Sequence, residues 1–347
     1  MRPRLVDWTL FTLVVLALLS GFGSFLVGQP AGWWVFVLHG IGGLALCLVL
    51  FWKVRRVWPR IAEPGRWDQG TIASVLTLVT ALLVLATGGI WTTWQWPVQF
   101  PNGLWWHVAI GLGLALFLLV HVALRFKPLR RRDLRGRRAW LQLLGVAASG
   151  GLLWVGNQVL NQALVTPGSQ RRFTGSRNTG DDFPVTMWMF DNPAPLDLSS
   201  WRLRIYGAGT VARTFTYAQL LEDAMDQIEA TLDCTSGWYT TQSWQGVSVG
   251  RLLGQVQPMG GAVVVSFRSI TGYRWSLPLS EATDALLATH VAGQPLTHGH
   301  GAPLRLVAPG RRGFQWIKWI TEMEVLTEHD LGKWGAIFTS GILGSRE

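Results

Sequence analysis

Five long apolar runs occupy the first 160 residues and constrain the fold more than any other feature. They cover residues 8–27, 33–52, 71–91, 105–126 and 139–160. Each is close to the roughly 20 residues that a helix needs to cross a bilayer. The first run is too long, and too plainly followed by others, to be a cleaved signal peptide. We therefore expect an all-α bundle of transmembrane helices, with four helices in 1–135 and a fifth in 136–160.

Charge is unevenly distributed along the chain and indicates an orientation. Residues 1–160 hold 15 Lys/Arg and 4 Asp/Glu, a net charge of +11, whereas residues 161–347 hold 15 and 16, a net charge of −1. The basic residues of the first half lie at the N-terminus, in 53–66 and in 125–138, and such residues mark cytoplasmic loops. We expect a multi-pass protein of the cell (inner) membrane, with its C-terminal domain on the periplasmic or extracellular side. The balanced second half gives no reason to expect nucleic-acid binding.

The first four apolar runs contain an internal repeat that includes two histidines. A shift of 68 residues places His39 on His107 and Gly43 on Gly111. Histidines inside a membrane are energetically expensive and are usually functional. Two imidazoles that face each other across a helix bundle are the usual axial ligands of a b-type haem, and the glycines one turn along would leave room for it. We expect one haem b between His39 and His107, which would exchange electrons with the quinone pool.

A second haem has weaker support in the sequence. His121 lies 14 residues beyond His107, about 21 Å along a helix axis, but its repeat partner is Lys53, a poor haem ligand. The same shift pairs Gly21 with Gly89. Two other roles stay open for these histidines, namely to bridge helices or to bind quinone.

The start of the fifth run carries paired arginines, Arg137 and Arg138. Residues 136–142 read Gly-Arg-Arg-Ala-Trp-Leu-Gln and precede a weakly apolar, Gly- and Ala-rich stretch. This pattern resembles a twin-arginine export signal, of the kind that moves proteins already folded around a cofactor. An ordinary positive-inside anchor would explain the arginines equally well. No convincing cleavage site follows, so we expect the helix to remain as a tether.

The second half reads as a linker followed by one globular domain. Residues 161–182 are polar and rich in Gly, Ser, Thr and Arg, which is typical of a loop. Apolar patterns in 183–347 predict strands at 201–206, 262–268, 304–308 and 316–324, and helices at 220–229, 247–256 and 279–288. We expect an α+β domain with a mostly antiparallel or mixed sheet. It contains no Walker loop, dinucleotide-binding glycine motif or zinc-ligand spacing.

Cys234 is the candidate reactive residue of this domain. Residues 233–239 read Asp-Cys-Thr-Ser-Gly-Trp-Tyr, a polar turn, whereas the other cysteine, Cys47, lies in an apolar run. A lone cysteine in such a turn is either a buried filler or a thiolate that binds a ligand. The cysteine alone does not decide between the two.

Three sequence motifs on either side of Cys234 accompany it. The first is Arg-Asn at 177–178 followed by Phe-Pro-Val at 183–185. The second is His-Gly-Ala-Pro-Leu-Arg-Leu-Val-Ala-Pro-Gly at 300–310, and the third is Trp-Ile-Lys-Trp-Ile at 316–320. This order and spacing resemble the sulfite oxidase fold of molybdopterin enzymes. That family includes sulfite oxidases, assimilatory nitrate reductases and periplasmic methionine sulfoxide reductase catalytic subunits. The resemblance covers residues 175–326 or so, which include the end of the linker at 161–182 and most of an expected molybdopterin domain at 183–347.

The resemblance implies a cofactor site at the matching positions. Cys234 would ligate molybdenum directly, and soft sulfur suits that metal. His300, Arg305 and Lys318 would hold the phosphate of the molybdopterin, which a guanidinium, an ammonium and backbone donors recognise well. For the charged side chains, a solvated strand edge is the alternative.

Four further residues are candidates for contact with the cofactor or the substrate. The resemblance implies that Asn178 contacts the cofactor, and Ser269 is a further candidate contact. Tyr239 or Tyr273 would donate a hydrogen bond to the substrate oxygen during catalysis.

The expected function is oxygen-atom transfer by a membrane-anchored molybdopterin oxidoreductase. Sulfite oxidases typically carry arginines just after the ligating cysteine, whereas Thr-Ser-Gly-Trp follows Cys234 here. This favours reduction of a sulfoxide or a similar S- or N-oxide, although Arg268, Arg274, Arg311 or Arg312 could still supply charge. A sulfite-type dehydrogenase is the alternative enzyme, and a non-catalytic module on a membrane cytochrome is the alternative of another class. A further redox partner is left open.

Overall fold

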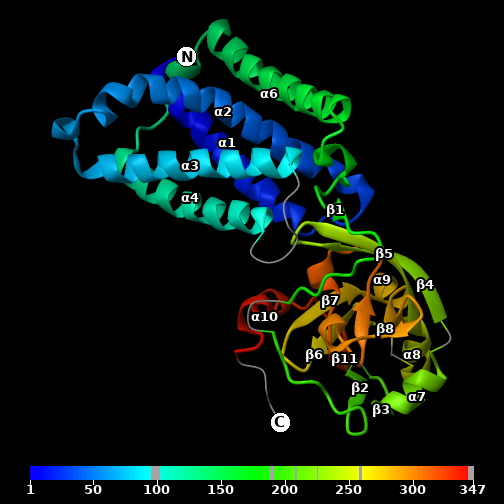
Figure 1. The fold of residues 1–347 in the computed structure, drawn as a ribbon. Coiled ribbons are helices and arrows are strands. Elements are labelled where there is room, and N and C mark those ends of the chain that lie inside the picture. The colour runs from blue at the N-terminus through cyan, green and yellow to red at the C-terminus, as the bar shows by residue number, and fades with distance from the viewer. Residues whose placement is uncertain (95–101, 188–190, 208, 225, 258–259, 343–347) are drawn as a thin grey trace. The chain divides into compact units, whose positions relative to one another are not determined.

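The chain divides into two compact units, Met1–Asn178 and Thr179–Glu347. The computed structural model describes residues 1–94, 102–187, 191–207, 209–224, 226–257 and 260–342 (Figure 1). The division between the units falls inside the segment 161–182 that the sequence analysis assigned to a linker.

The first unit is a bundle of long apolar helices. They are α1 (Pro3–Ser24), α2 (Trp33–Ile61), α3 (Gln69–Thr93), α4 (Gly103–Arg125) and α6 (Arg137–Ala163) (Figure 1). Shorter elements connect or follow them: η1 (Pro30–Gly32), η2 (Pro64–Arg66), α5 (Arg131–Leu134), η3 (Pro167–Gln170) and β1 (Arg177–Asn178). Within the described part of the chain, these five long helices have a length and composition that suit a membrane crossing.

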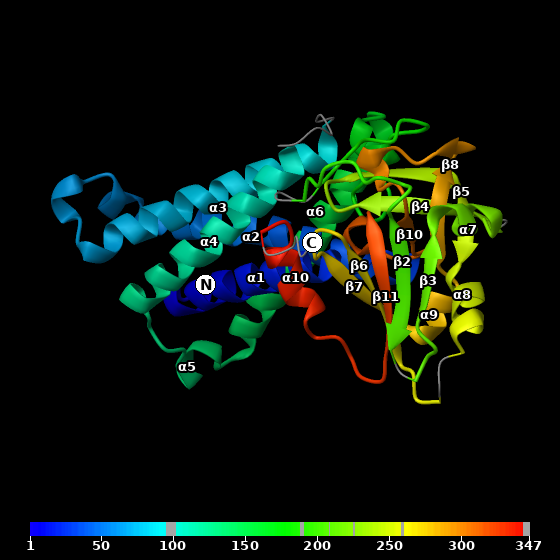
Figure 2. The same cartoon turned by 90° about the horizontal axis from the view of Figure 1, so that it is seen from below.

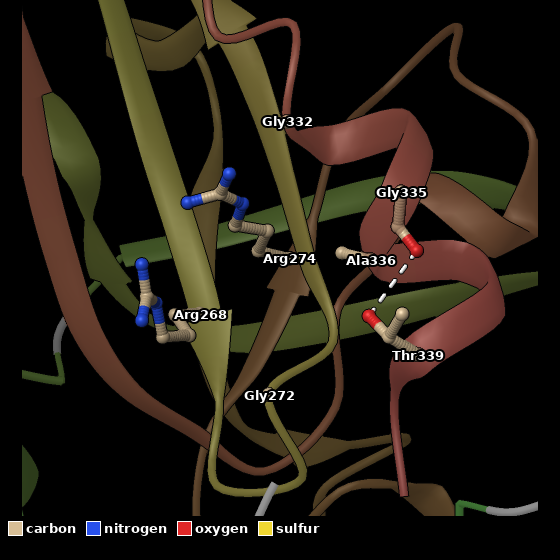
Figure 3. Close-up of a pocket in the computed structure, with 7 residues that line it drawn as sticks. All are labelled: Arg268, Gly272, Arg274, Gly332, Gly335, Ala336 and Thr339. Atoms are coloured by element: carbon tan, nitrogen blue, oxygen red, sulfur yellow. Dashed lines mark hydrogen bonds between the residues drawn. The ribbon is translucent and has the colours of Figure 1, made fainter. Parts of the chain in front are cut away.

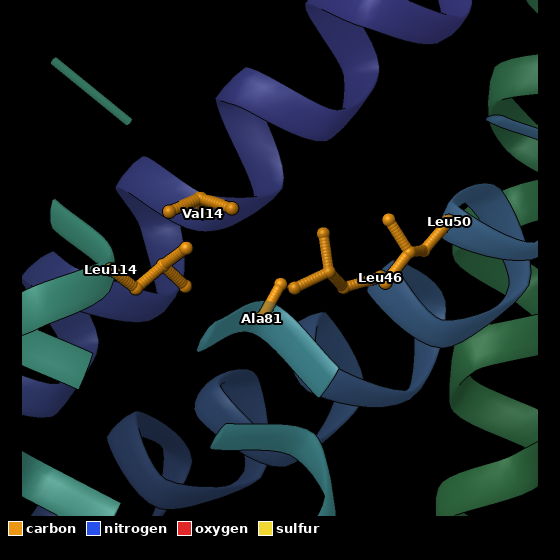
Figure 4. Close-up of a cluster of buried hydrophobic side chains, with 5 residues drawn as sticks. All are labelled: Val14, Leu46, Leu50, Ala81 and Leu114. Atoms are coloured by element: carbon orange, nitrogen blue, oxygen red, sulfur yellow. The ribbon is translucent and has the colours of Figure 1, made fainter. Parts of the chain in front are cut away.

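The helices of the first unit pack in pairs. α1 packs on α2, α3 packs on α4, and α6 packs on α2. One buried cluster joins the first four helices (Figure 4) and comprises Val14, Leu46, Leu50, Ala81 and Leu114. Side chains on the outside are apolar as well: Leu119 is 68% exposed and Leu152 is 73% exposed. Helices that are apolar on every face are typical of membrane spans or of the core of a large protein.

The first sheet of the second unit carries Cys234. Its strands are β4 (Asp226–Cys234), β5 (Trp238–Ser248), β8 (Leu286–Val291), β9 (Gln294–Pro295) and β10 (Arg305–Val307). β5 pairs with β4 and β8, and β8 also pairs with β9 and β10, always antiparallel. Side chains of β5 alternate between the core and the surface, as expected for a sheet covered on one face. Trp244 is fully buried on the inner face, where its Nε1 donates to the carbonyl of Ala230 at 3.1 Å.

The second sheet has the strand order β3–β2–β11–β6–β7, which can be followed in Figure 2. Its strands are β2 (Arg202–Gly207), β3 (Arg213–Thr216), β6 (Val264–Ser269), β7 (Arg274–Pro278) and β11 (Ile320–Leu326). β2 and β11 are parallel, and the other pairs are antiparallel. The helical elements are α7 (Tyr217–Glu222), α8 (Val249–Val256), α9 (Leu279–Thr283), α10 (Lys333–Thr339), η4 (His298–His300) and η5 (Gly313–Gln315).

The predicted elements of the second unit are confirmed in type, with two corrections. The strands predicted at 201–206, 262–268, 304–308 and 316–324 correspond to β2, β6, β10 and β11, and the helix predicted at 247–256 corresponds to α8. The helices predicted at 220–229 and 279–288 are wrong in their second halves. α7 ends at Glu222 before β4 begins at Asp226, and α9 ends at Thr283 before β8 begins at Leu286. Pairing of β4 and β8 with β5 overrides the local helix preference there.

Candidate functional site

Cys234 ends β4 at the tight turn that leads into β5. It is paired with Trp238 across the hairpin, and the amide of Gly237 donates to the Cys234 carbonyl at 3.0 Å. Gly237 has a φ of +92°, a conformation that glycine adopts without a Cβ penalty. The turn brings the Ser236 hydroxyl to 3.0 Å from the Cys234 Sγ. The thiol therefore sits at a fixed place with a hydroxyl beside it.

A buried ion pair fixes the base of this turn. Arg312 Nη1 donates to Asp233 Oδ1 at 2.7 Å, and both side chains are almost fully buried. Arg312 Nη2 reaches the carbonyl of Cys234 at 3.4 Å. The next residue, Gly313, approaches the turn so closely that an added Cβ would lie 3.0 Å from the Cys234 Cα. Residues 312–313, which precede β11, therefore pack directly on the turn that carries Cys234.

Thr186 links Cys234 to Lys318. Its Oγ1 lies 3.5 Å from the Cys234 Sγ, and its carbonyl accepts a hydrogen bond from Lys318 Nζ at 2.8 Å. Lys318 Nζ also donates to the carbonyl of Gly299. Gly301, at a φ of +107°, allows this approach, because a Cβ there would lie 3.0 Å from the Cβ of Lys318.

Arg305 lies deep in the site beside His300 and Phe183. Its Nη1 donates to the His300 carbonyl at 2.9 Å, and its guanidinium lies over the rings of Phe183 and Trp244, 5.5 and 5.6 Å from their centroids. The His300 ring stacks on Phe183 at 3.9 Å. His300 Nε2 lies 2.8 Å from the Phe183 carbonyl, and Nδ1 lies 2.9 Å from the Thr297 hydroxyl. Both ring nitrogens of His300 are therefore engaged by protein groups.

The site holds two largely enclosed cations, Arg305 and Lys318, and the charge of Lys318 interacts with the buried carboxyl group of Asp191 without a direct ion pair. Among the described residues, neither Arg305 nor Lys318 forms an ion pair with a carboxylate. Arg305 is 3% exposed, and its buried Nε has no hydrogen-bond partner. Burial lowers the pKa of Arg305 to about 10; burial and then the Arg305 charge lower the pKa of Lys318 to about 7. An anion would stabilise the charged form of both buried groups, so the cradle fits a ligand that carries a phosphate and meets the Cys234 sulfur.

Thr186 thus connects Cys234 to Lys318, and Phe183 connects His300 to Arg305; these are the four residues to which the resemblance assigned the cofactor. The other predicted site residues lie differently. Ser269 ends β6, and its Oγ accepts hydrogen bonds from Thr271. Tyr273 is buried, and its hydroxyl donates to the Phe314 carbonyl at 2.9 Å.

Two more predicted residues lie outside this contact set. Tyr239 stands on β5 opposite Asp233, and its carbonyl accepts from the amide and hydroxyl of Thr179. Asn178 is exposed at the end of β1, the last residue of the first unit.

The four arginines considered as additional charges have carboxylate neighbours. Arg268 and Arg274 face each other across β6 and β7 and line a pocket of about 280 Å³ whose other wall is α10 (Figure 3). Arg274 lies 3.3 Å from Asp330, and Arg268 lies 3.6 Å from Glu322. Arg311 makes a bidentate pair with Glu281, and Arg312 pairs with Asp233. The lining of the pocket does not include Cys234, Arg305 or Lys318.

A second candidate site lies in the first unit, between His39 of α2 and His107 of α4. Their ring centroids are 6.0 Å apart and the rings are nearly perpendicular, at 83°. His39 Nδ1 lies 3.0 Å from the Ala17 carbonyl, and His107 Nδ1 lies 3.1 Å from the Val84 carbonyl. A backbone carbonyl on Nδ1 fixes the tautomer and leaves Nε2 for a ligand.

These contacts refine the repeat. The ring of His39 lies against Gly21 and that of His107 against Gly88, so the first helices of the two pairs are related by 67 residues and the second helices by 68. His121 is apart from this pair, with its Nδ1 3.0 Å from the Ser74 hydroxyl. Its repeat partner Lys53 pairs with Asp7 at 2.6 Å.

Three residues that shape the cysteine site had no role predicted from the sequence: Thr186, Ser236 and Asp233. Arg312 was considered only as a source of charge. Ser236 was within the quoted turn, and its position two residues after the cysteine was a usable signal. The Asp233–Arg312 pair joins positions 79 residues apart, and no local pattern reveals it.

The comparisons with known proteins agree with this geometry. Residues 190–334 match the family model described as "Oxidoreductase molybdopterin binding domain". The chain is 31% identical over 157 residues to the protein-methionine-sulfoxide reductase catalytic subunit MsrP of Xanthomonas axonopodis pv. citri, covering 40% of this chain and 49% of that protein. It is 27% identical over 166 residues to the uncharacterized oxidoreductase YuiH of Bacillus subtilis, covering 47% and 83%.

Among solved structures, the sulfane dehydrogenase SoxCD of Paracoccus pantotrophus is similar with a TM-score of 0.37 and 23% identity, over 39% of this chain and 40% of that one. The chain spans about half the length of the MsrP protein that it matches. The family match and the two sequence relatives agree with a thiol beside a cationic cradle, and residues 190–334 form a molybdopterin-binding oxidoreductase domain.

Proposed function

We propose that the protein is a membrane-anchored molybdopterin enzyme that reduces a sulfoxide or a similar neutral S- or N-oxide by oxygen-atom transfer. The observation that carries the proposal is the cationic cradle beside Cys234, in which the buried Arg305 and the partly buried Lys318 have no ion-paired carboxylate among the described residues. A cofactor that brings a phosphate and a thiolate-ligated metal satisfies both halves of this site at once.

The residues of the chain would divide the work of holding the cofactor. Cys234 would ligate molybdenum through its Sγ, and Ser236 and Thr186 would orient the sulfur with their hydroxyls. Arg305 and Lys318 would bind the phosphate. When bound, the molybdopterin group supplies two-electron oxygen-atom transfer, and the protein supplies access and electrostatics.

Two of the sequence-predicted contacts take a modified role. Both ring nitrogens of His300 meet protein groups, so we propose that His300 acts through its carbonyl, which holds Arg305 in place. The Tyr273 hydroxyl is committed to a backbone carbonyl, so Tyr239 is the better candidate to donate to the substrate oxygen. Asn178 and Ser269 stay as proposed peripheral contacts of the cofactor.

A neutral substrate fits the charge around Cys234. The turn after the cysteine has no charged side chain, and the nearby Arg312 is neutralised by Asp233. Sulfite is an anion, and its recognition would need a further unpaired cation besides Arg305 and Lys318, which we assign to the cofactor phosphate. The match to a protein-methionine-sulfoxide reductase catalytic subunit supports a sulfoxide as substrate.

The helices of the first unit support membrane anchoring. Five helices have the length of a bilayer crossing, and their outward side chains are apolar. We propose that they hold the catalytic domain on the outer side, because the basic residues of 1–160 lie in the loops assigned to the cytoplasm. A reporter fused after the C-terminus tests this topology, and activity of a cytoplasm-specific reporter would contradict it.

His39 and His107 support a haem b in this bundle, which would receive electrons from the quinone pool. Metal–imidazole bonds are about 2 Å long, so two imidazoles on one iron have ring centres roughly 6 Å apart, close to the 6.0 Å seen here. A Cβ added at Gly43 or Gly111 would meet no atom within 4 Å, so space is open beside both histidines. The reduced-minus-oxidised spectrum tests the site: His39→Ala and His107→Ala should abolish the haem signal, and His121→Ala should keep it.

A dye-coupled assay of the molybdenum-loaded, full-length protein tests the activity. A reduced viologen should be reoxidised by a methyl sulfoxide in the presence of wild-type protein, and not in the presence of Cys234→Ala. Reduction of an acceptor dye by sulfite, without turnover of any S- or N-oxide, would replace the proposal by the dehydrogenase alternative. Loaded protein that is inactive in both directions would favour a non-catalytic module.

A further inference from the structure

The segment that follows α6 in the first unit contains two arginines with incomplete partners. Arg171 Nη1 donates to the Gly175 carbonyl at 2.8 Å, and its Nη2 donates to the Trp94 carbonyl at 3.0 Å. The Nε atoms of Arg171 and Arg177 are buried and have no hydrogen-bond partner. The two guanidiniums are close enough for their charges to interact: burial and then repulsion from Arg177 lower the pKa of Arg171 to about 10. Two neighbouring cations are therefore partly desolvated.

No carboxylate of this unit is available to balance them. Residues 1–178 contain four acidic residues, and each has a partner elsewhere. Asp7 pairs with Lys53 and Arg56, Glu63 with Arg66, and Asp68 with Arg125, while Asp133 accepts from the backbone of Arg130. Among the described residues, neither Arg171 nor Arg177 is in an ion pair. Desolvated cations without a counter-charge are costly, so this pair points to an anion that the first unit does not supply.

The segment that carries the two arginines lies near His39 of the proposed haem site. Phe173 packs edge-on against Phe36 of α2, with ring centroids 5.7 Å apart. Phe36 is three residues before His39, about 4.5 Å along the helix axis on the same face. The segment therefore lies one turn beyond the first histidine of the proposed haem site.

The same segment also reaches the helix that supports the second histidine. The guanidinium of Arg171 lies 4.4 Å from the ring centroid of Trp91 on α3. Trp91 is four residues beyond Thr87, whose hydroxyl lies 3.3 Å from Nδ1 of His107. Residues 171–173 thus contact both helices close to the levels at which His39 and His107 face each other.

We infer that Arg171 and Arg177 form an anion site that binds the two propionate groups of a haem held between His39 and His107. The inference rests on the haem of the proposed function. A haem carries two carboxylates at one edge, and a guanidinium is the side chain best suited to pair with a carboxylate. A lipid phosphate offers the same chemistry, and the experiment separates the two sources.

The inference predicts a shift in the reduction potential of the haem. Positive charge near the iron favours the reduced state, which carries one positive charge fewer. Arg171→Gln and Arg177→Gln should therefore lower the midpoint potential of the haem in detergent-purified, full-length protein, and the double variant should lower it most. Arg171→Lys keeps the charge and should retain most of the wild-type value. Arg66→Gln, which removes an exposed arginine paired with Glu63, is the matched control and should leave the potential unchanged.

A second measurement does not depend on the potential. Protein from haem-depleted cells is reconstituted with haem or with its dimethyl ester, whose propionates carry no charge. Wild-type protein should bind haem more tightly than the ester, and the double glutamine variant should lose that preference. Haem-containing variants with a wild-type potential and a wild-type preference for haem over the ester would overturn the inference and leave the proposed function intact. In that case, loss of co-purified phospholipid phosphate from the variants would assign the arginines to a lipid. Wild-type protein without haem would overturn the haem proposal and this inference together.

Discussion

Replacing Arg312 with methionine should destabilise the second unit and release the turn that carries Cys234. The Arg312–Asp233 pair is short, at 2.7 Å, and its side chains are only 5% and 2% exposed. Arg312→Met leaves a buried carboxylate without its cation, and loss of one partner of a buried pair costs about 3–5 kcal/mol. The lost contact from Nη2 to the Cys234 carbonyl is long, at 3.4 Å, so it adds little. We expect the free energy of unfolding to fall by about 3–5 kcal/mol.

The measurement is the urea dependence of protease resistance of the second unit in the full-length protein, detected at its C-terminus. Asp233→Asn combined with Arg312→Met removes both charges and should be less destabilising than Arg312→Met alone, because no buried charge remains unpaired. A double-mutant cycle therefore should give a coupling of roughly 1–3 kcal/mol. Additive single variants, with a coupling below about 0.5 kcal/mol, would refute the claim that this pair holds the turn.

Three further predictions follow from the same site. Gly301→Ala forces a left-handed φ on alanine beside Lys318 and should cost about 1–2 kcal/mol of stability. Gly254→Ala on α8, where a Cβ meets no atom within 4 Å, should be neutral or stabilising in the same assay. In cofactor-free protein the pKa of Lys318 is about 7, below the value of roughly 10.4 in an unfolded chain. The unfolded state then binds more protons between those values, so stability should rise with pH from about 7 to about 10, and a Lys318→Met variant with the same slope would contradict this. Ser236→Ala removes a hydroxyl 3.0 Å from the Cys234 Sγ and should lower the reduction potential of the molybdenum in a redox titration, while the metal content stays at the wild-type level. An unchanged reduction potential would contradict the assigned contact.

The residue patterns of short stretches of sequence predicted the long helices and the turn around Cys234. The five apolar runs correspond to five long helices, and the polar turn around Cys234 is the hairpin turn between β4 and β5. The helices predicted at 220–229 and 279–288 failed where β4 and β8 pair with β5, since strand pairing is set by partners distant in sequence. The repeat was read with one shift, whereas the contacts of His39 and His107 require two, because the connection within the second helix pair is one residue longer.

For the candidate site too, the residue types were available from the sequence, whereas their contacts were not. The set of Cys234, Arg305 and Lys318 was implied by the family resemblance, and the structure links Cys234 to Lys318 through Thr186 and places Arg305 against Phe183. The ion pair of Arg312 with Asp233 was not visible, because only the folded chain brings positions 79 residues apart into contact. The engagement of both His300 ring nitrogens was equally hidden, since a motif gives the type of a side chain and not its partners.

The most direct test of the account is the molybdenum content of full-length protein purified from cells that make molybdopterin. The account predicts stoichiometric molybdenum with molybdopterin in the wild type and a marked loss of the metal, or an altered molybdenum spectrum, in Cys234→Ala. Wild-type protein that is folded and free of molybdenum under these conditions would contradict the assignment of Cys234, Arg305 and Lys318 as the cofactor site.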